Sequence, residues 1–509
     1  MIHKSRFNVA LLSLAAFGLS IAPFAQADVH LPALFSDGMV LQQGMEVPVW
    51  GWASDGELVT VTFRGQTAKT TAKGGKWMLN LRKLKAGGPD EMVVTGKNSI
   101  TLKNVLVGEV WICSGQSNME FPLSRSFDSK ADIEASANLK IHLFHVPKMK
   151  AESPKDDVKA AWTACDPDTV KGFSAVGYYF GRDLQKARGV PVGMIETDWG
   201  GSPAEVWMKQ EVLESNPRYK QEILDAYVGQ KKGYDDALAA FEKERDEAKA
   251  SGKSFNKRAP GAPSWRPTEL YNGMIAPLVP YAIKGAIWYQ GESNAGRAEQ
   301  YRSLYADMIR NWRQDWNEGD FTFICVQLAP FMAVKDQPGD SAWAELREAQ
   351  LLSTRTLPNA GMAVITDVGD PKDIHPTKKK PVGERLALAA RGIAYGEKIE
   401  FSGPVYHSMK VKDDNKATIT FDHVGKGLAA RDGELKGFSI CGDDKKWFWA
   451  KAEIKGKNQV VVSSPEVAHP VAVRFGWADC PVVNLWNKDG LPATPFRTDD
   501  FPMITAPKK

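Results

Sequence analysis

Three separated segments of the chain contain residues whose types suit ester hydrolysis. Gly115-Gln116-Ser117-Asn118-Met119 places a serine beside a glycine, Trp288–Asn294 ends in an amide, and Asp373–Pro376 contains a histidine. A serine hydroxyl is scarcely ionised at neutral pH, so it needs a neighbouring base before it can attack a carbonyl carbon. The three segments together supply a nucleophile, a base and an amide donor, which is the combination of a serine hydrolase.

We predict Ser117 as the nucleophile and His375 as the general base, which takes the serine proton and returns it to the leaving alcohol. The oxyanion that forms needs N–H donors already in place. The main-chain N–H groups of Ser117 and Gly201 and the amide of Asn294 are the candidates. The ordinary structural alternatives are a plain turn at Gly200-Gly201 and a helix cap at Asn294.

Two acidic residues precede His375 and could orient its imidazole. Asp373 lies two residues before the histidine and Asp370 lies five before it. Either carboxylate could accept a hydrogen bond from the far imidazole nitrogen if the loop folds back, and a main-chain carbonyl could do the same. We take Asp373 as the predicted orienter, with a serine–histidine dyad supported by main chain as the alternative.

Strands alternate with helices in the part of the chain that must position these residues. Continuous apolar runs suit parallel strands that are covered on both faces, and we expect them at Val105–Cys113, Val190–Thr197, Lys284–Tyr289, Phe321–Leu328 and Met362–Thr366. Helical spacing separates them at Ser174–Ala187, Gln300–Trp316, Trp343–Arg355 and Val382–Tyr395. This order predicts an α/β fold with a doubly wound parallel sheet, whose ligands bind at the carboxyl ends of the strands.

The chain is too long for one hydrophobic core, so we expect several domains. Alternation of apolar and polar residues predicts a β-sandwich-like segment over 28–104, and β character returns over 401–509. The catalytic α/β domain spans 105–400. A charged helical insertion at about 211–267 interrupts it and is either a lid, an interface or a solvated face.

Residues 1–27 read as a secretory signal peptide rather than as part of the fold. Lys4 and Arg6 precede an apolar run, and Ala25-Gln26-Ala27 supplies the small-x-small cleavage pattern. The run is shorter than the roughly 20 residues of a membrane anchor. We therefore expect export to a periplasm or the cell exterior, with no membrane span.

Composition limits the partners and cofactors. The 65 basic and 61 acidic residues nearly balance, which gives no electrostatic case for nucleic acid. No C-x-x-C pair supports a zinc or redox site, so we expect no metal and no cofactor. Of the five cysteines, Cys113 and Cys325 read as buried thiols, whereas Cys441 and Cys480 could form a bridge.

The chain resembles the sialate O-acetylesterases and related carbohydrate acetylesterases of the SGNH hydrolase superfamily. The resemblance covers nearly the whole chain after the leader, and its motifs are Gly115–Met119, Gly200–Pro203, Trp288–Asn294, Leu346–Gln350, Asp373–Pro376 and Gly490–Asp499. It implies an SGNH-type sheet with Ser117 as nucleophile, His375 as base, and Gly201 and Asn294 as oxyanion donors. Many SGNH enzymes place an aspartate three residues before the histidine, where this chain has Lys372.

An acetylated sugar or sialoglycan is the substrate that this resemblance implies. Trp199, Trp288 and Tyr289 adjoin the motifs and either stack on a sugar or pack in the core. Arg347 is a candidate for the carboxylate of sialic acid, with a structural ion pair as its alternative. Removal of O-acetyl groups from sialic acids is the leading hypothesis. Deacetylation of xylan or pectin is the nearest alternative, and an inactive carbohydrate-binding protein on a hydrolase scaffold is another.

Overall fold

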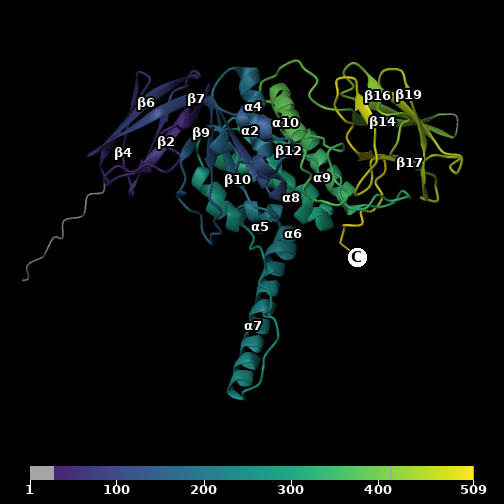
Figure 1. The fold of residues 1–509 in the computed structure, drawn as a ribbon, viewed down its shortest axis with the longest axis horizontal. Helices are drawn as coiled ribbons and strands as arrows, with labels where there is room; N and C mark the ends of the chain where they lie inside the picture. The colour runs from purple at the N-terminus through teal and green to yellow at the C-terminus, as the bar shows by residue number, and fades with distance from the viewer. Residues whose placement is uncertain (1–27, 413–414, 508–509) are drawn as a thin grey trace, which may run out of the picture.

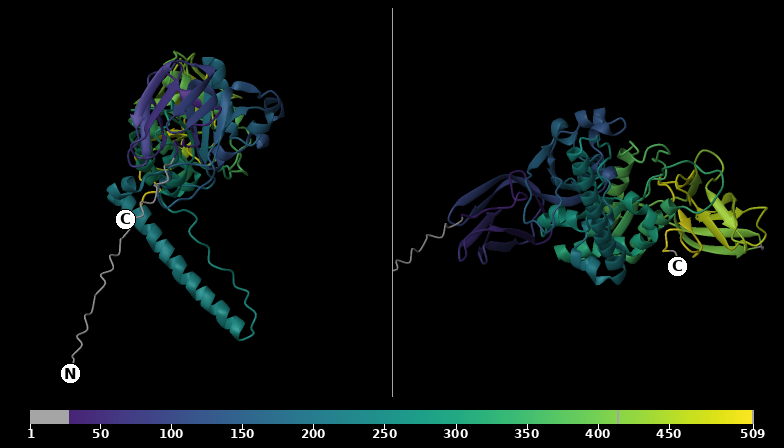
Figure 2. Two further views of the ribbon diagram at one scale, coloured as in Figure 1. Left: turned by 90° about the vertical axis from the view of Figure 1, so that its left-hand side faces the viewer. Right: turned by 90° about the horizontal axis from the view of Figure 1, so that it is seen from below.

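The computed structural model describes residues 28–412 and 415–507, and the predicted signal peptide lies outside them. A central α/β region is flanked by β strands of the N-terminal segment at one end and of the C-terminal segment at the other (Figure 1). The view from below in Figure 2 shows the same order, with the α/β region between the two β segments. Across the described residues, no helix is both long and apolar enough to cross a membrane.

A large mixed sheet forms the centre of the molecule, with the strand order β13-β12-β11-β7-β10-β8-β9. The neighbours from β13 to β8 are parallel, and β9 pairs antiparallel with β8. The strands are β7 (Ser99–Gly115), β8 (Asn138–His145), β9 (Trp162–Cys165), β10 (Val192–Asp198), β11 (Gly285–Tyr289), β12 (Thr322–Val326) and β13 (Ala360–Ala363). The predicted strands are present, and β8 and β9 extend the sheet beyond the prediction.

Helices cover both faces of this sheet. On one face, Val176 and Leu386 of two neighbouring helices share a core cluster with Trp111 of β7. On the other face, Leu304 and Leu346 belong to the cluster that contains Trp288. The four helices are α4 (Ala175–Arg188) and α10 (Lys380–Ile393) on the first face, with α8 (Ala298–Trp316) and α9 (Ala342–Thr356) on the second. The predicted α/β class is confirmed.

The N-terminal β segment is continuous with the central sheet because β7 belongs to both. Its first half pairs with β6, and its second half pairs with β10 and β11. The predicted boundary between residues 104 and 105 therefore lies inside one unbroken strand. The remaining strands of this segment are β1 (Val40–Gln42), β2 (Val47–Trp52), β3 (Leu58–Phe63), β4 (Gln66–Thr71), β5 (Lys76–Leu81) and β6 (Gly87–Thr95).

The insertion is an arm of one long helix and a non-helical return segment, and it projects from the body (Figures 1 and 2). Its long helix α7 (Ala226–Ala250) has no buried residue, and residues 251–267 return beside it. Short helices connect the arm and the loops to the sheet: α1 (Ser117–Glu120), η1 (Leu123–Arg125), α2 (Lys130–Glu134), α3 (Pro167–Val170), η2 (Ala204–Trp207), α5 (Gln210–Ser215), α6 (Pro217–Tyr219), η3 (Lys220–Asp225), η4 (Tyr271–Ile275), η5 (Ala276–Leu278) and η6 (Glu292–Arg297).

The C-terminal segment packs antiparallel strands around its own apolar core, which includes Ile419, Phe438 and Val460. Its strands are β14 (Val405–Lys412), β15 (Lys416–Asp422), β16 (Leu428–Ala430), β17 (Phe438–Cys441), β18 (Trp447–Trp449), β19 (Lys451–Lys455), β20 (Gln459–Ser463), β21 (Ala472–Phe475), β22 (Leu485–Asn487) and β23 (Phe496–Arg497). The bridge considered between Cys441 and Cys480 is absent, because both are free, buried thiols. Cys441 is fixed within β17, whereas Cys480 lies in the loop after β21.

Candidate active site

Ser117 begins the short helix α1 directly after the central strand β7. The turn between them requires glycine, since Gly115 has φ +142° and a Cβ there would lie 2.2 Å from the carbonyl oxygen of Tyr289. Gly115 is the register partner of both Asp198 in β10 and Tyr289 in β11. The carboxyl ends of three strands are therefore level, and Ser117 emerges at their middle.

His375 lies in the loop between β13 and α10, and its Nε2 is 2.8 Å from the Oγ of Ser117. The structure thus brings together two residues that are 258 positions apart in the sequence. Burial is the largest cause that lowers the pKa of His375 from its usual 6.5. A neutral imidazole at pH 7 can accept the serine proton, which is the state that a general base needs.

Asp373 contacts His375 in two ways. Its Oδ1 accepts a hydrogen bond of 2.8 Å from the main-chain N–H of His375 and lies 3.5 Å from the imidazole Nδ1. Its side chain is 57% exposed. Asp370 instead accepts from the main-chain N–H of Lys372. Asp373 is therefore the acid on the far side of the imidazole, at a distance longer than a normal hydrogen bond.

The glycine turn after β10 lies against the serine. A Cβ on Gly200 would be 3.2 Å from the Cβ of Ser117, and Gly201 has φ +76°. The N–H of Gly200 donates to Glu120, and the carbonyl of Gly201 accepts from the hydroxyl of Ser293. These contacts fix the turn beside Ser117, which is where an oxyanion donor would be needed if this serine attacks an ester.

Asn294 lies in η6 after β11 and is 1% exposed. Its Oδ1 accepts from the main-chain N–H of Ala204 and from the amide of Gln290, and its Nδ2 donates to Glu205. The protein therefore uses three of the four hydrogen-bonding positions of this amide. One amide hydrogen has no partner among the described residues, and the oxyanion role of Asn294 depends on it.

A family model described as "Carbohydrate esterase, sialic acid-specific acetylesterase" matches residues 107–241 and 247–391, which is more than half of the chain. The chain belongs to this esterase family. The sialate O-acetylesterase of Rattus norvegicus is 29% identical over 90% of this chain and 92% of its own length. The sialate O-acetylesterase of Homo sapiens is 28% identical over 91% of each chain.

A solved structure gives the same architecture. The crystal structure of a carbohydrate acetylesterase from Xanthomonas citri has a TM-score of 0.80 and 39% identity, and the match covers 93% of this chain and 100% of that one. The predicted resemblance to carbohydrate acetylesterases is therefore confirmed over nearly the full length.

Two aromatic residues that we expected at the sugar lie instead in the core of this esterase. Trp288 is 0% exposed and packs between Trp207 and Trp312. Tyr289 is also 0% exposed. Both belong to β11, whose residues are all buried, so neither ring can stack on a substrate. The substrate-binding prediction is wrong for these two residues. Trp199, by contrast, is half-buried.

The guanidinium of Arg347 also has a structural role, because it forms hydrogen bonds within the protein. The side chain is 0% exposed and donates to the main-chain carbonyls of Leu328, Ala329, Ala478 and Asp479. These bonds join α9 to the loop after β21. The prediction that Arg347 binds a substrate carboxylate is wrong, because its donors are used by carbonyls within the protein.

A buried polar cluster next to the segments of Ser117 and His375 was not predicted. The amide of Asn118 donates to Glu292 and to the carbonyl of Ile374, and its Oδ1 accepts from Lys379. Lys379 is 0% exposed, and burial lowers its pKa to about 7. Burial raises the pKa of Glu292. Asn118 therefore ties the helix of Ser117 to the loop of His375. The only sequence signal was its place directly after the serine.

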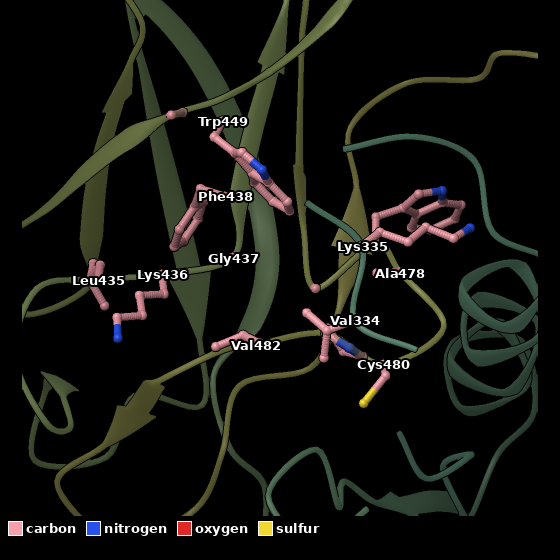
Figure 3. Close-up of a pocket in the computed structure, with 14 residues that line it drawn as sticks. Val334, Lys335, Leu435, Lys436, Gly437, Phe438, Trp449, Ala478, Cys480 and Val482 are labelled. Atoms are coloured by element: carbon pink, nitrogen blue, oxygen red, sulfur yellow. The ribbon is translucent and has the colours of Figure 1, made fainter. Parts of the chain in front are cut away.

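The cavities of the molecule indicate where a substrate can lie. A cavity of about 360 Å³ is formed by C-terminal residues such as Phe438 and Trp449 together with Lys335 (Figure 3), and neither Ser117 nor His375 lines it. Another cavity, of about 330 Å³, is lined by Pro203, which follows the glycine turn, and by Trp265 from the arm. Trp265 packs edge-on against Trp199, so the base of the arm borders the site.

Proposed function

We propose that this protein is an exported serine esterase that removes O-acetyl groups from sialic acids and releases acetate. The contact of 2.8 Å between Ser117 Oγ and His375 Nε2 carries the proposal, because it supplies an activated nucleophile at the carboxyl edge of the sheet. Membership of the sialic acid-specific acetylesterase family supports the substrate class.

The reaction proceeds through an acetyl-enzyme. His375 takes the proton of Ser117 as the serine oxygen attacks the acetyl carbonyl, and the resulting oxyanion accepts hydrogen bonds from the N–H groups of Ser117 and Gly201 and from the amide of Asn294. The imidazolium then protonates the sugar oxygen, which leaves. A water molecule, deprotonated by His375, attacks the acetyl group and frees acetate. Asp373 stabilises the imidazolium in both steps.

The fold and the cellular site are part of the same proposal. We assign catalysis to residues 105–400 as an SGNH-type sheet, and the β segments 28–104 and 401–509 flank it. Residues 1–27 direct export and are removed.

A neutral acetylated sugar is the second candidate substrate. The relative from Xanthomonas citri, which is 39% identical, is described as a carbohydrate acetylesterase without a named sugar. Xylan and pectin esters would use the same serine and histidine with a different sugar pocket.

Acetate release from O-acetylated sialic acids, acetylated xylan and acetylated pectin tests both candidates. We expect the sialic acids to be the best substrates and Ser117→Ala to lower kcat by at least about 10⁴-fold. Ser124→Ala removes an exposed serine seven positions away and serves as the matched control, with full activity expected. Full activity in Ser117→Ala would refute the serine mechanism. Acetate release only from xylan or pectin would refute the sialic acid assignment.

A further inference from the structure

Sialic acids carry a carboxylate that neutral sugars lack, and Arg347 is not available to bind it. We propose that Arg125 binds this carboxylate and gives the active site its preference for acidic sugars. The inference rests on the proposed function and adds to it a residue that selects the substrate.

The chain holds Arg125 beside the catalytic histidine loop. Arg125 ends helix η1, eight residues after Ser117. The next two residues are bound to that loop: the hydroxyl of Ser126 donates to the carbonyl of Thr377 over 3.1 Å, and the N–H of Phe127 donates to the same carbonyl over 2.9 Å. Thr377 is two residues after His375, so the backbone at Arg125 is anchored next to the base.

The guanidinium of Arg125 is oriented but has no acidic partner. It lies 4.8 Å from the centre of the Phe121 ring, and its side chain is exposed. Within 28–412 and 415–507, no carboxylate forms an ion pair with it. Stacking on a ring holds the plane of a guanidinium while leaving its N–H edge free for a carboxylate, which it can bind through two parallel hydrogen bonds.

Three other cations around the site are already paired with carboxylates. Lys148 contacts Glu120 at 2.5 Å, Lys150 contacts Glu269 at 2.9 Å, and Arg297 contacts Glu205 at 2.6 Å. Lys379 is buried and bound to Asn118. Among these residues, Arg125 combines exposure with an unneutralised charge.

The positive charge of Arg125 acts on His375. Together with burial and with Lys379, it lowers the pKa of His375, whereas Asp373 acts in the opposite direction. Lys378 is a further exposed cation on the same loop, and its amine lies 6.0 Å from the centre of the Phe127 ring. An anion bound at Arg125 therefore lies within the electrostatic range of the catalytic pair.

The test compares two substrates that differ only at the carboxylate: an O-acetylated sialic acid and its carboxamide, in which a neutral amide replaces the charged group. The readout is the ratio of kcat/KM for the acid to kcat/KM for the amide. In the unaltered enzyme we expect this ratio to exceed one. Arg125→Gln should lower it by about ten- to one-hundred-fold, as expected for a charge-assisted hydrogen bond, with the larger change in KM. Arg125→Lys should recover part of it.

Arg431→Gln is the matched control, because Arg431 is also exposed and stacked on a ring, that of Trp486, but lies in the C-terminal β segment. Its ratio should equal that of the unaltered enzyme. The role of Arg125 would be overturned if Arg125→Gln kept the acid-to-amide ratio of the unaltered enzyme, or if the unaltered enzyme showed no preference for the acid. Either result would leave the esterase function intact. Failure of the unaltered enzyme on both sialic acid substrates would instead overturn the proposed function and this inference with it. Thermal unfolding of each variant checks its fold.

Discussion

Replacing Asp373 by asparagine separates the two contacts that this residue makes with His375. An asparagine keeps the side-chain carbonyl oxygen that accepts from the main-chain N–H over 2.8 Å, so the loop retains its shape. The substitution removes the negative charge that lies 3.5 Å from the imidazole Nδ1. The variant therefore measures how much that charge stabilises the imidazolium formed during catalysis.

The expected magnitude follows from the distance and the exposure. Two unit charges 3.5 Å apart interact by about 1.2 kcal/mol in water and by about 5 kcal/mol at an effective dielectric constant of 20. Asp373 is 57% exposed and His375 is 36% exposed, so the aqueous value is the nearer one. We expect a loss of about 1–2 kcal/mol of transition-state stabilisation, which lowers kcat by roughly 5- to 30-fold.

The assay is kcat for a chromogenic acetate ester, measured for Asp373→Asn beside Asp370→Asn. Asp370 is a matched control because it is an exposed acid of the same loop that bonds to Lys372 instead. A loss of about 10⁴-fold, as in enzymes with a buried triad aspartate, would show that Asp373 is not exposed during catalysis and contacts His375 more closely than 3.5 Å. An unchanged kcat would assign orientation of the imidazole to the main chain.

Two further predictions concern pH and stability. Because burial lowers the pKa of His375 from 6.5, the base is neutral at pH 7 and loses its function only when it is protonated at lower pH. A profile of kcat/KM between pH 4 and pH 9 should therefore show activity falling as the pH decreases, with a midpoint below 6.5. A midpoint above 6.5 would contradict the burial of this imidazole. Arg347→Met removes the guanidinium that donates to four main-chain carbonyls, of which those of Ala329 and Asp479 keep another donor. Denaturant unfolding should therefore show a free energy of unfolding lower by about 3 kcal/mol or more. A rise in KM with unchanged stability would restore Arg347 as a substrate-binding residue.

The sequence predicted the serine–histidine contact for a physical reason that the structure makes explicit. Continuous apolar runs identify buried parallel strands, and parallel strands end at one edge of a sheet. The register at Gly115, which pairs with both Asp198 and Tyr289, makes those ends level. Residues that follow such strands therefore lie at the same edge of the sheet. Because β13 is separated from β7 by β12 and β11, the loop after Ala363 must also cross those strand ends to bring His375 to Ser117.

The same apolar pattern should have excluded Trp288 and Tyr289 from the substrate site. Both residues lie within the run that predicted strand β11, and a strand covered on both faces buries every side chain. The chemical type of the two rings and their closeness to a motif favour a sugar-binding role. Their position inside the strand carried more information, because it determines exposure.

The boundary predicted at residue 105 shows what a change of pattern means physically. Along β7 the burial changes from alternating to complete, although the strand continues without a break. The change in periodicity marks the place where the strand leaves the N-terminal β segment and enters a sheet with helices on both faces. Periodicity reports the environment of a strand, and it locates a domain boundary only where that environment changes at a turn.

Lys379 is the residue that sequence reasoning was least able to place. It stands among three consecutive lysines, a pattern typical of a solvated surface, yet it is 0% exposed. Burial disfavours its charged form, which is why its pKa falls to about 7. Such a cost is tolerated where the amine organises a site: it holds Asn118, which in turn binds the carbonyl of Ile374 beside the catalytic histidine. A lysine buried against its usual preference thus indicates the active site as clearly as the serine motif does.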